Sequence, residues 1–194
     1  MNLPTITFLC GPSGVGKTTL ANALFDKLDG LQAHSLRAPL FNAARGAFFD
    51  CDPSLELTFE PTKRNIPGTG ATVDDFTKRF HVFLDENYLP PALGRLAAHF
   101  ATSATEFFDK VVFDDGDRSL IDDIRFVAKE FGKENCLIVN ILRGNPGNLN
   151  WSNDFLRSER IHCIDFPNCY SSPAEMLTAF LAQLASTKSE PANA

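Results

Sequence analysis

The sequence predicts an α/β fold in which a parallel β-sheet is flanked by helices on both faces. Short apolar segments alternate along the chain with amphipathic or helix-capped segments, as in parallel strands joined by helical crossovers. The first apolar segment also runs directly into a glycine-rich turn and a helix. A chain of 194 residues is long enough for one domain with a lid-like insertion. We therefore expect a single domain over residues 1–186 and a flexible tail over 187–194.

The glycine-rich turn is the most specific motif in the chain. In TITFLCGPSGVGKTT, residues 5–19, four positions match the pattern G-x-x-x-x-G-K-[ST] of P-loop NTPases. Its glycines let backbone N–H groups face a phosphate chain, at the positive end of the following helix. The lysine that follows can bind the terminal phosphates, and the hydroxyl after it can bind Mg²⁺. The predicted ATP-binding residues of this loop are Gly11, Pro12, Ser13, Gly14, Val15, Gly16, Lys17, Thr18 and Thr19, with Thr18 as the Mg²⁺ ligand.

The alternative explanation of this motif is a glycine-rich turn with an incidental lysine. The segment before the loop, residues 5–10, is apolar enough for a buried strand, and residues 19–28 have the pattern of a helix. Because strand, loop and helix occur in the order that a phosphate site requires, the nucleotide-binding interpretation is favoured.

Composition narrows the class of protein further. The formal charge of −6 leaves no broad basic face of the kind that general nucleic-acid binders present, although a local basic cleft stays open. There is no apolar stretch long enough to span a bilayer and no signal peptide, so we expect a cytoplasmic protein without a membrane partner. The five cysteines are scattered, which is typical of reduced thiols, and the spacing of His162, Cys163 and Cys169 disfavours zinc.

The first half of the chain begins with the predicted strand, loop and helix. Asp29-Gly30 ends that helix, and residues 33–37 form a second, short strand. Pro39 opens a helix that runs to Phe49. The segment 51–73 is rich in proline, glycine and threonine, and we interpret it as a functional loop on the acceptor side of the site.

Two amphipathic helices follow this loop. Thr72 to Asp75 has the pattern of a helix start, and Pro90-Pro91 ends the helix. A second helix spans 92–108. Apolar residues, many of them among the 18 phenylalanines, lie along one face of each helix. We assign these phenylalanine stripes to the core rather than to a platform that stacks on bases.

The second half predicts the remaining strands. Residues 110–114 form a strand that ends in acid, followed by a helix that starts near Ser119 and ends at Gly132. The most apolar segment, 136–142, is predicted to be a central strand, with a polar loop over 143–157. Residues 161–165 form the last strand, and a helix starts at Ser172.

Ligands of open parallel sheets bind at the carboxyl ends of the strands, and three predicted segments meet there. They are the glycine-rich loop, the acidic turn after the 110–114 strand, and the turn after the 136–142 strand. Phosphoryl transfer needs positive charge on the donor and an acid near Mg²⁺ or near an attacking hydroxyl. The predicted catalytic residues are therefore Lys17, Asp114, Asp115 and Arg118.

Other basic side chains supply further candidates. Arg143 is a candidate for the nucleotide lid, and Lys63, Arg64 and Arg79 form a candidate basic patch for the acceptor. The competing explanations are turn-capping acids for the aspartates, surface salt bridges for Arg118 and Arg143, and a solvated face for the basic patch.

The loop GPSGVGKTT resembles those of nucleoside monophosphate kinases, guanylate kinases in particular, although the rest of the chain lacks a guanylate-kinase GMP segment. Residues 61–94 and 111–147 resemble a bacteriophage group that contains deoxynucleoside monophosphate kinases and 5-hydroxymethyluracil DNA kinases. In that group an acid-ended strand, a turn with an arginine, a helix and a second strand ending in arginine recur, which corresponds here to Asp114, Asp115, Arg118 and Arg143.

The resemblance implies an enzyme that uses ATP and Mg²⁺ to phosphorylate a deoxynucleotide-type acceptor in the host-cell cytoplasm. Our first expectation is transfer to the hydroxymethyl group of 5-hydroxymethyluracil in phage DNA, so that DNA carrying this modified pyrimidine would be the partner. The alternative is a deoxynucleoside monophosphate kinase that makes diphosphates. A further alternative, from another class, is an ATPase switch without an acceptor.

Overall fold

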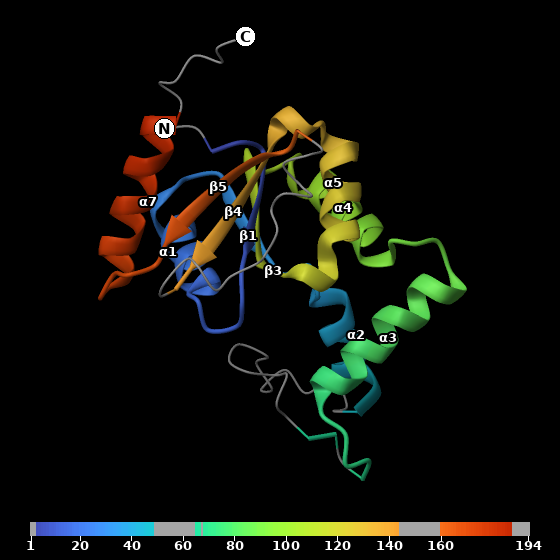
Figure 1. Ribbon diagram of the computed structural model, residues 1–194. Helices are drawn as coiled ribbons and strands as arrows, with labels where there is room; N and C mark the ends of the chain where they lie inside the picture. Colours follow the sequence, from blue (N-terminus) through green and yellow to red (C-terminus); the bar gives the residue numbers. More distant parts are fainter. Residues whose placement is uncertain (1–2, 49–64, 67, 144–159, 188–194) are drawn as a thin grey trace.

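The computed structural model describes residues 3–48, 65–66, 68–143 and 160–187. Within them, five strands form one all-parallel sheet in the order β2-β3-β1-β4-β5 (Figure 1). The strands are β1 (Ile6–Cys10), β2 (Leu31–His34), β3 (Lys110–Gly116), β4 (Cys136–Leu142) and β5 (His162–Pro167). The helices are α1 (Lys17–Lys27), α2 (Ala38–Phe48), α3 (Val73–Asn87), α4 (Ala92–Ala104), α5 (Ile121–Phe131) and α7 (Pro173–Thr187), with 3-10 turns η2 (Arg118–Leu120) and η3 (Lys133–Asn135).

Helices cover both faces of the sheet, so the predicted α/β architecture is confirmed. Figure 1 shows α1 and α7 on one side of the sheet and α4 and α5 on the other. Each side has its own apolar core. Buried residues from α4, α5 and the sheet include Phe8, Phe113 and Ile138, whereas those on the α1 and α7 side include Leu20, Val139 and Phe180. Among the described residues, no helix is long and apolar enough to cross a bilayer, which agrees with the prediction from the sequence.

The predicted strand over 33–37 is wrong in its position. The strand runs over Leu31–His34, and residues 35–37 form a turn. The Asp115 carboxylate causes this difference, because it accepts hydrogen bonds from the Ser35 hydroxyl and from the backbone N–H groups of Leu36 and Arg37. Backbone groups bound to a side chain in this way are not available for a strand ladder.

The helices α2 and α3 form a smaller unit beside the sheet, which we call the α2–α3 unit (Figure 1). Ala44, Ile66 and Val73 are buried at its centre, and Phe41, Phe48 and Phe76 pack around them. Helix α3 begins as predicted, with a capping box between Thr72 and Asp75. Residues 51–64 and 67 of the predicted acceptor-side loop lie outside the described residues, as do 144–157 of the polar loop and 188–194 of the tail.

The phenylalanine stripes are only partly in the core. Phe80 and Phe100 pack against the core beneath α4 and α5. However, Phe83 is 46% exposed and Phe107 is 81% exposed. Helix α4 ends at Ala104 rather than at residue 108, so Phe107 leaves the helical face on which its spacing had placed it.

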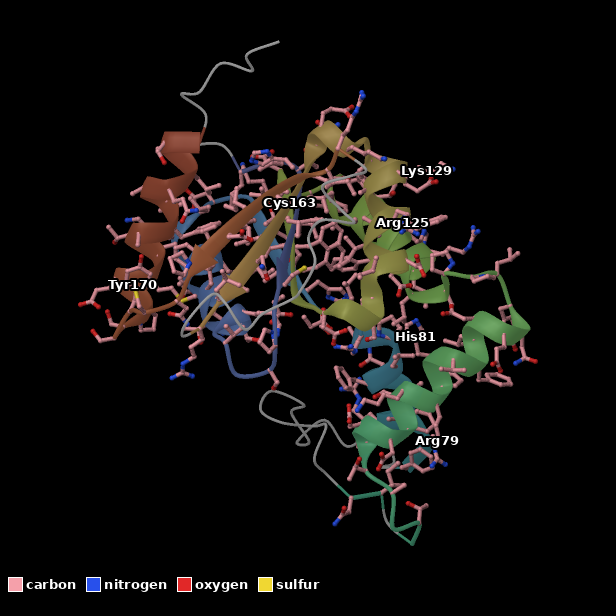
Figure 2. The ribbon with its side chains drawn as sticks, in the orientation of Figure 1. Arg79, His81, Arg125, Lys129, Cys163 and Tyr170 are labelled. Atoms are coloured by element: carbon pink, nitrogen blue, oxygen red, sulfur yellow. The ribbon has the colours of Figure 1, made fainter. Side chains whose placement is uncertain are left out.

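Polar contacts connect α3 to α4 and α5. The Asp85 carboxylate accepts a hydrogen bond from the N–H of Ala92, and the buried Asp123 carboxylate accepts one from the N–H of Gly94. His81 Nε2 lies 3.4 Å from an oxygen of each of these carboxylates (Figure 2). The Asp123 carboxylate, with Asp85 beside it, raises the pKa of His81 above its ordinary value in spite of partial burial.

Gly94 marks the point at which α4 and α5 approach most closely. A Cβ atom at this position would lie 2.8 Å from both the Cα and the carbonyl oxygen of Asp123, and backbone atoms cannot move aside as a side chain can. We predict that Gly94→Ala lowers the free energy of unfolding by about 2 kcal/mol, as over-packed sites do. Urea denaturation would measure this, with exposed Ser103→Ala on the same helix as the control. A Gly94→Ala protein as stable as the parent would contradict the close approach.

The raised pKa of His81 predicts a pH-dependent contribution to stability. A histidine whose pKa is higher in the folded than in the unfolded chain stabilises the fold fully below its unfolded value, and this stabilisation is lost as the pH rises through the folded value. His81→Asn should therefore cost more stability at about pH 5.5 than at about pH 8.5. Urea unfolding at both pH values tests this, with exposed His99→Asn as the control. An equal cost at both pH values would show that the charge of His81 contributes nothing.

Candidate functional site

The turn between β1 and α1, which we call the glycine loop (residues 11–16), has a backbone that only glycine adopts without strain. Gly11, Gly14 and Gly16 have φ angles of 138°, 74° and 101°. A Cβ atom on Gly11 would lie 2.7 Å from the carbonyl oxygen of Ile141, and one on Gly16 would lie 2.6 Å from the Asn168 side-chain nitrogen. The glycines of the motif are thus required by conformation and by close packing together.

The side chain of Lys17 binds back to the main chain of the glycine loop. Its Nζ donates hydrogen bonds to the carbonyl oxygens of Gly11 at 2.7 Å and Pro12 at 2.9 Å. Burial lowers the pKa of this ammonium group. Gly16, the N-cap residue of α1, has no side chain that could bind the N–H groups of the first turn. The loop therefore presents a cation and the positive end of a helix at the same place.

Two side chains from other strand ends hold the outer side of the glycine loop. Asn168, just after β5, donates a hydrogen bond of 2.6 Å to the carbonyl oxygen of Val15. Arg143, just after β4, donates one of 3.1 Å to the carbonyl oxygen of Gly14. The sequence predicted Arg143 at this edge but missed Asn168. The position of Asn168 directly after the last strand was the only signal for it.

Asp114, near the end of β3, faces α1. The Thr18 hydroxyl interacts with its carboxylate and lowers the pKa of Asp114, so the residues that the sequence had proposed for Mg²⁺ and for acid chemistry are neighbours. Burial, with a smaller contribution from the negative charge of Asp115, raises the pKa of Asp114 above its ordinary value. An exposed threonine beside a partly buried carboxylate provides two adjacent oxygen ligands of the kind that Mg²⁺ prefers.

Asp115 is next to Asp114 in the chain but has a different environment. Its two oxygens are engaged by the turn at residues 35–37, at distances of 2.7 to 3.1 Å. The two neighbouring acids therefore differ in what they can do, because one carboxylate faces the glycine loop and the other holds the start of α2.

Arg37 forms a second connection between these turns. Its guanidinium pairs with the Asp117 carboxylate and donates hydrogen bonds to the Ser119 hydroxyl and the Asp115 carbonyl oxygen. Burial by itself would raise the pKa of Asp117, but Arg37 and hydrogen bonds from Ser119 outweigh it, so that the pKa is lowered. Asp117 also caps η2 through the backbone N–H of Ser119. Asp117 thus has the turn-capping role that was the alternative for the acids of this turn, whereas no sequence pattern pointed to Arg37.

A pocket of about 360 Å³ opens beside Asp114, between α1, the end of β2 and α2, and we call it the α1–α2 pocket. Asn22, Asn42 and Arg45 provide its amide and guanidinium groups, and Phe41 provides an aromatic side chain. Sequence reasoning missed these residues, since nothing in their spacing relates α1 to α2. They meet because parallel strands deliver both helices to the same edge of the sheet.

The remaining predicted residues are not assembled at this edge within the described part of the chain. Arg79 lines a different, mostly apolar pocket of about 330 Å³ in the α2–α3 unit, together with Phe76, Phe80 and Phe83. Figure 2 shows Arg79 on α3, away from the sheet. Lys63 and Arg64 lie outside the described residues, and so does the side chain of Arg118, whose backbone opens η2.

Metal chemistry from clustered protein ligands has no support in the described residues. Within those ranges no group of three or more histidine, cysteine, aspartate or glutamate side chains could hold a metal ion. The oxygen pair of Thr18 and Asp114 is a smaller set, of the kind that binds Mg²⁺ together with phosphate oxygens.

No protein-family model matches this chain, and no curated protein matches it.

The two aspartates predict opposite effects of the same substitution. Asp115→Asn replaces an acceptor of three hydrogen bonds with a group that can accept fewer, so we expect it to lower the free energy of unfolding by about 1–3 kcal/mol. Asp114→Asn removes a charge that burial disfavours, so stability should be unchanged or higher. Urea unfolding of both variants at neutral pH compares them directly. Equal losses would show that both carboxylates are structural.

Proposed function

We propose that this chain is a P-loop NTPase that acts as an ATP-dependent kinase on a deoxynucleotide-type acceptor. One observation supports this most strongly: the Asp114 carboxylate lies beside the Thr18 hydroxyl in the first turn of α1, directly after the glycine loop, and also lines the α1–α2 pocket. Burial disfavours the charge of Asp114, so an ionised carboxylate at this position costs stability. A residue held at a cost to stability is a candidate for function.

On the donor side, the glycine loop and Lys17 would bind the phosphates of ATP. In the structure Lys17 binds two loop carbonyl oxygens, and phosphate oxygens would replace these as its partners. Thr18 and Asp114 would hold Mg²⁺, which when bound supplies positive charge that neutralises the phosphate oxygens. Arg143, on the outer side of the loop, would add a further positive charge near the nucleotide.

On the acceptor side, the α1–α2 pocket would receive the group that is phosphorylated. Its Asn22 and Asn42 amides can bind the polar edge of a base, and Phe41 can contact its ring. Asp114 lines the same pocket, so that donor and acceptor would meet at this carboxylate. Arg118 is the first residue of η2, which follows β3. We still propose that its side chain stabilises the negative charge of the transition state.

In the proposed reaction, an acceptor oxygen attacks the γ-phosphorus of ATP. A bond forms between that oxygen and phosphorus, the bond from the γ-phosphorus to the β–γ bridging oxygen breaks, and ADP leaves. A hydroxyl acceptor also loses a proton, and Asp114, which lines the acceptor pocket, is the carboxylate that would accept it. This favours a hydroxyl, such as the hydroxymethyl group of 5-hydroxymethyluracil in DNA, over a phosphate acceptor, which needs no base. The bacteriophage kinase group that the chain resembles includes enzymes for both kinds of acceptor.

A deoxynucleoside monophosphate kinase is the second candidate. Arg45 is the observation in its favour, because a guanidinium in the acceptor pocket could bind the phosphate of a free nucleotide.

A panel of acceptors separates these functions. The chain would be incubated with γ-labelled ATP, Mg²⁺ and, in separate reactions, the four deoxynucleoside monophosphates, hydroxymethyl-dUMP, plain DNA and DNA containing 5-hydroxymethyluracil. We expect label in the modified DNA. Label in a mononucleotide would establish the second candidate, and label released only as inorganic phosphate would contradict both kinases and favour an ATPase switch.

Lys17→Met should reduce transfer to the preferred acceptor by at least about 100-fold, because the variant lacks the charge that stabilises the transferring phosphoryl group. Lys27→Met, which removes an exposed lysine from the other end of α1, is the matched control and should retain activity. The same labelled-ATP assay measures both. Parent-like transfer by Lys17→Met would exclude the glycine loop as the donor site.

A further inference from the structure

We infer that Arg37 is a positioning residue, which acts through Asp117 to fix the α2 wall of the acceptor pocket relative to Asp114. The inference rests on the proposed function, since it concerns the same pocket. Arg37 itself contacts neither the glycine loop nor Lys17 in any hydrogen bond of the described residues. Its effect on transfer would therefore be indirect.

The contacts of Arg37 join two turns that are 80 residues apart in the sequence. Its guanidinium binds Asp117 and Ser119, which follow β3, and its Nη1 lies 3.4 Å from the Asp115 carbonyl oxygen. Its own backbone N–H binds the Asp115 carboxylate at 3.1 Å. One residue thus fastens the β2–α2 turn to the end of β3 through both its side chain and its main chain.

The guanidinium is engaged rather than free to take a substrate phosphate. The Arg37 and Asp117 side chains are 24% and 35% exposed, so the pair is partly shielded from water. The Asp117 carboxylate is ionised at neutral pH and balances the charge of Arg37, whose guanidinium helps to lower its pKa. A phosphate that recruited Arg37 would have to break this pair first.

The position of Arg37 determines the start of α2. The carbonyl oxygen of Arg37 accepts hydrogen bonds from the N–H groups of Leu40 and Phe41, in the first turn of the helix. Phe41, Asn42 and Arg45 of the α1–α2 pocket follow within the next turns. Because α2 also belongs to the α2–α3 unit with its separate apolar cluster, a loosened turn would let the pocket wall move relative to Asp114. Displacement by about 1 Å can lower a rate about 100-fold.

Asp117→Asn is the decisive variant. Asparagine still caps η2, since it is as good a capping residue as aspartate, but it no longer carries the charge that holds Arg37. If Arg37 acts through Asp117, both Arg37→Met and Asp117→Asn should lower kcat/KM for the acceptor by about 10- to 100-fold. The KM for ATP should change little, and the double variant should be no worse than either single variant. Arg37→Lys should restore part of the activity.

The experiment measures transfer from labelled ATP to the acceptor that the parent chain prefers, with KM determined separately for ATP and acceptor. Lys78→Met, which breaks an exposed ion pair with Asp74 on α3, is the matched control and should behave like the parent. Separate kinetic constants for acceptor and ATP distinguish positioning from a general loss of stability. Positioning would affect the constants for the acceptor, whereas a loss of stability would lower kcat/KM for acceptor and ATP alike. Melting temperatures verify folding, and Asp117→Asn keeps the test valid if Arg37→Met does not fold.

Three results would overturn the inference while the parent remains an active kinase. Arg37→Met could transfer phosphate as the parent does. Asp117→Asn could be fully active while Arg37→Met is not, which would mean that Arg37 contacts the acceptor directly. The losses of the two single variants could also add in the double variant. A parent chain that transfers phosphate to no acceptor overturns the proposed function instead, and the inference falls with it.

Discussion

An irregularity at the end of β3 is the constraint on which the site depends. The three residues of β1 from Phe8 to Cys10 are matched by the four residues of β3 from Phe113 to Gly116, so that β3 contains one extra residue. Such a bulge re-aims the side chains beside it. Asp114 lies beside Thr18 of α1, and Asp115 binds the turn before α2. Gly116 must lack a side chain, because a Cβ atom would lie 2.4 Å from the Cys10 sulfur. Its carbonyl oxygen is then free to accept the N–H of Gly11, which begins the glycine loop.

The molecule combines two parts that are held together in different ways. The sheet and its four covering helices have extensive apolar cores on both faces, whereas the α2–α3 unit has only a small cluster of its own. Leu36 and Leu40 do reach the main core, but charged and polar groups make up much of the remaining connection. Asp115, Asp117 and Arg37 form it at one end, and His81, Asp85 and Asp123 form it at the other. Ionic contacts are directional and sensitive to pH, so they set the orientation of this unit more than they add to its stability.

The environments of the acids explain why residue type alone does not assign their roles. Asp114, Asp115 and Asp117 lie within four positions, yet burial raises the pKa of the first while the pairing with Arg37 and the capped turn lower that of the third. The middle carboxylate is occupied by hydrogen bonds to residues about 80 positions earlier in the chain. An acid that is held by structural donors serves the fold. An acid that is disfavoured by its surroundings, and that faces an open pocket, is the better candidate for chemistry.

The sequence by itself determined the parts that depend on local pattern. The alternation of apolar and helical segments predicted the parallel sheet, because period and capping are properties of neighbouring residues. The glycine loop could be identified from the sequence because each of its glycines has a positive φ angle, which is a local property of the backbone. Only the tertiary structure decided which residues meet across the sheet edge. Asn168, Arg37 and the pocket residues Asn22, Asn42 and Arg45 carry no distinguishing spacing, and the strand predicted over 33–37 failed because a carboxylate far along the chain binds that segment. Long-range hydrogen bonds outweigh local propensity there, and no window of sequence contains both partners.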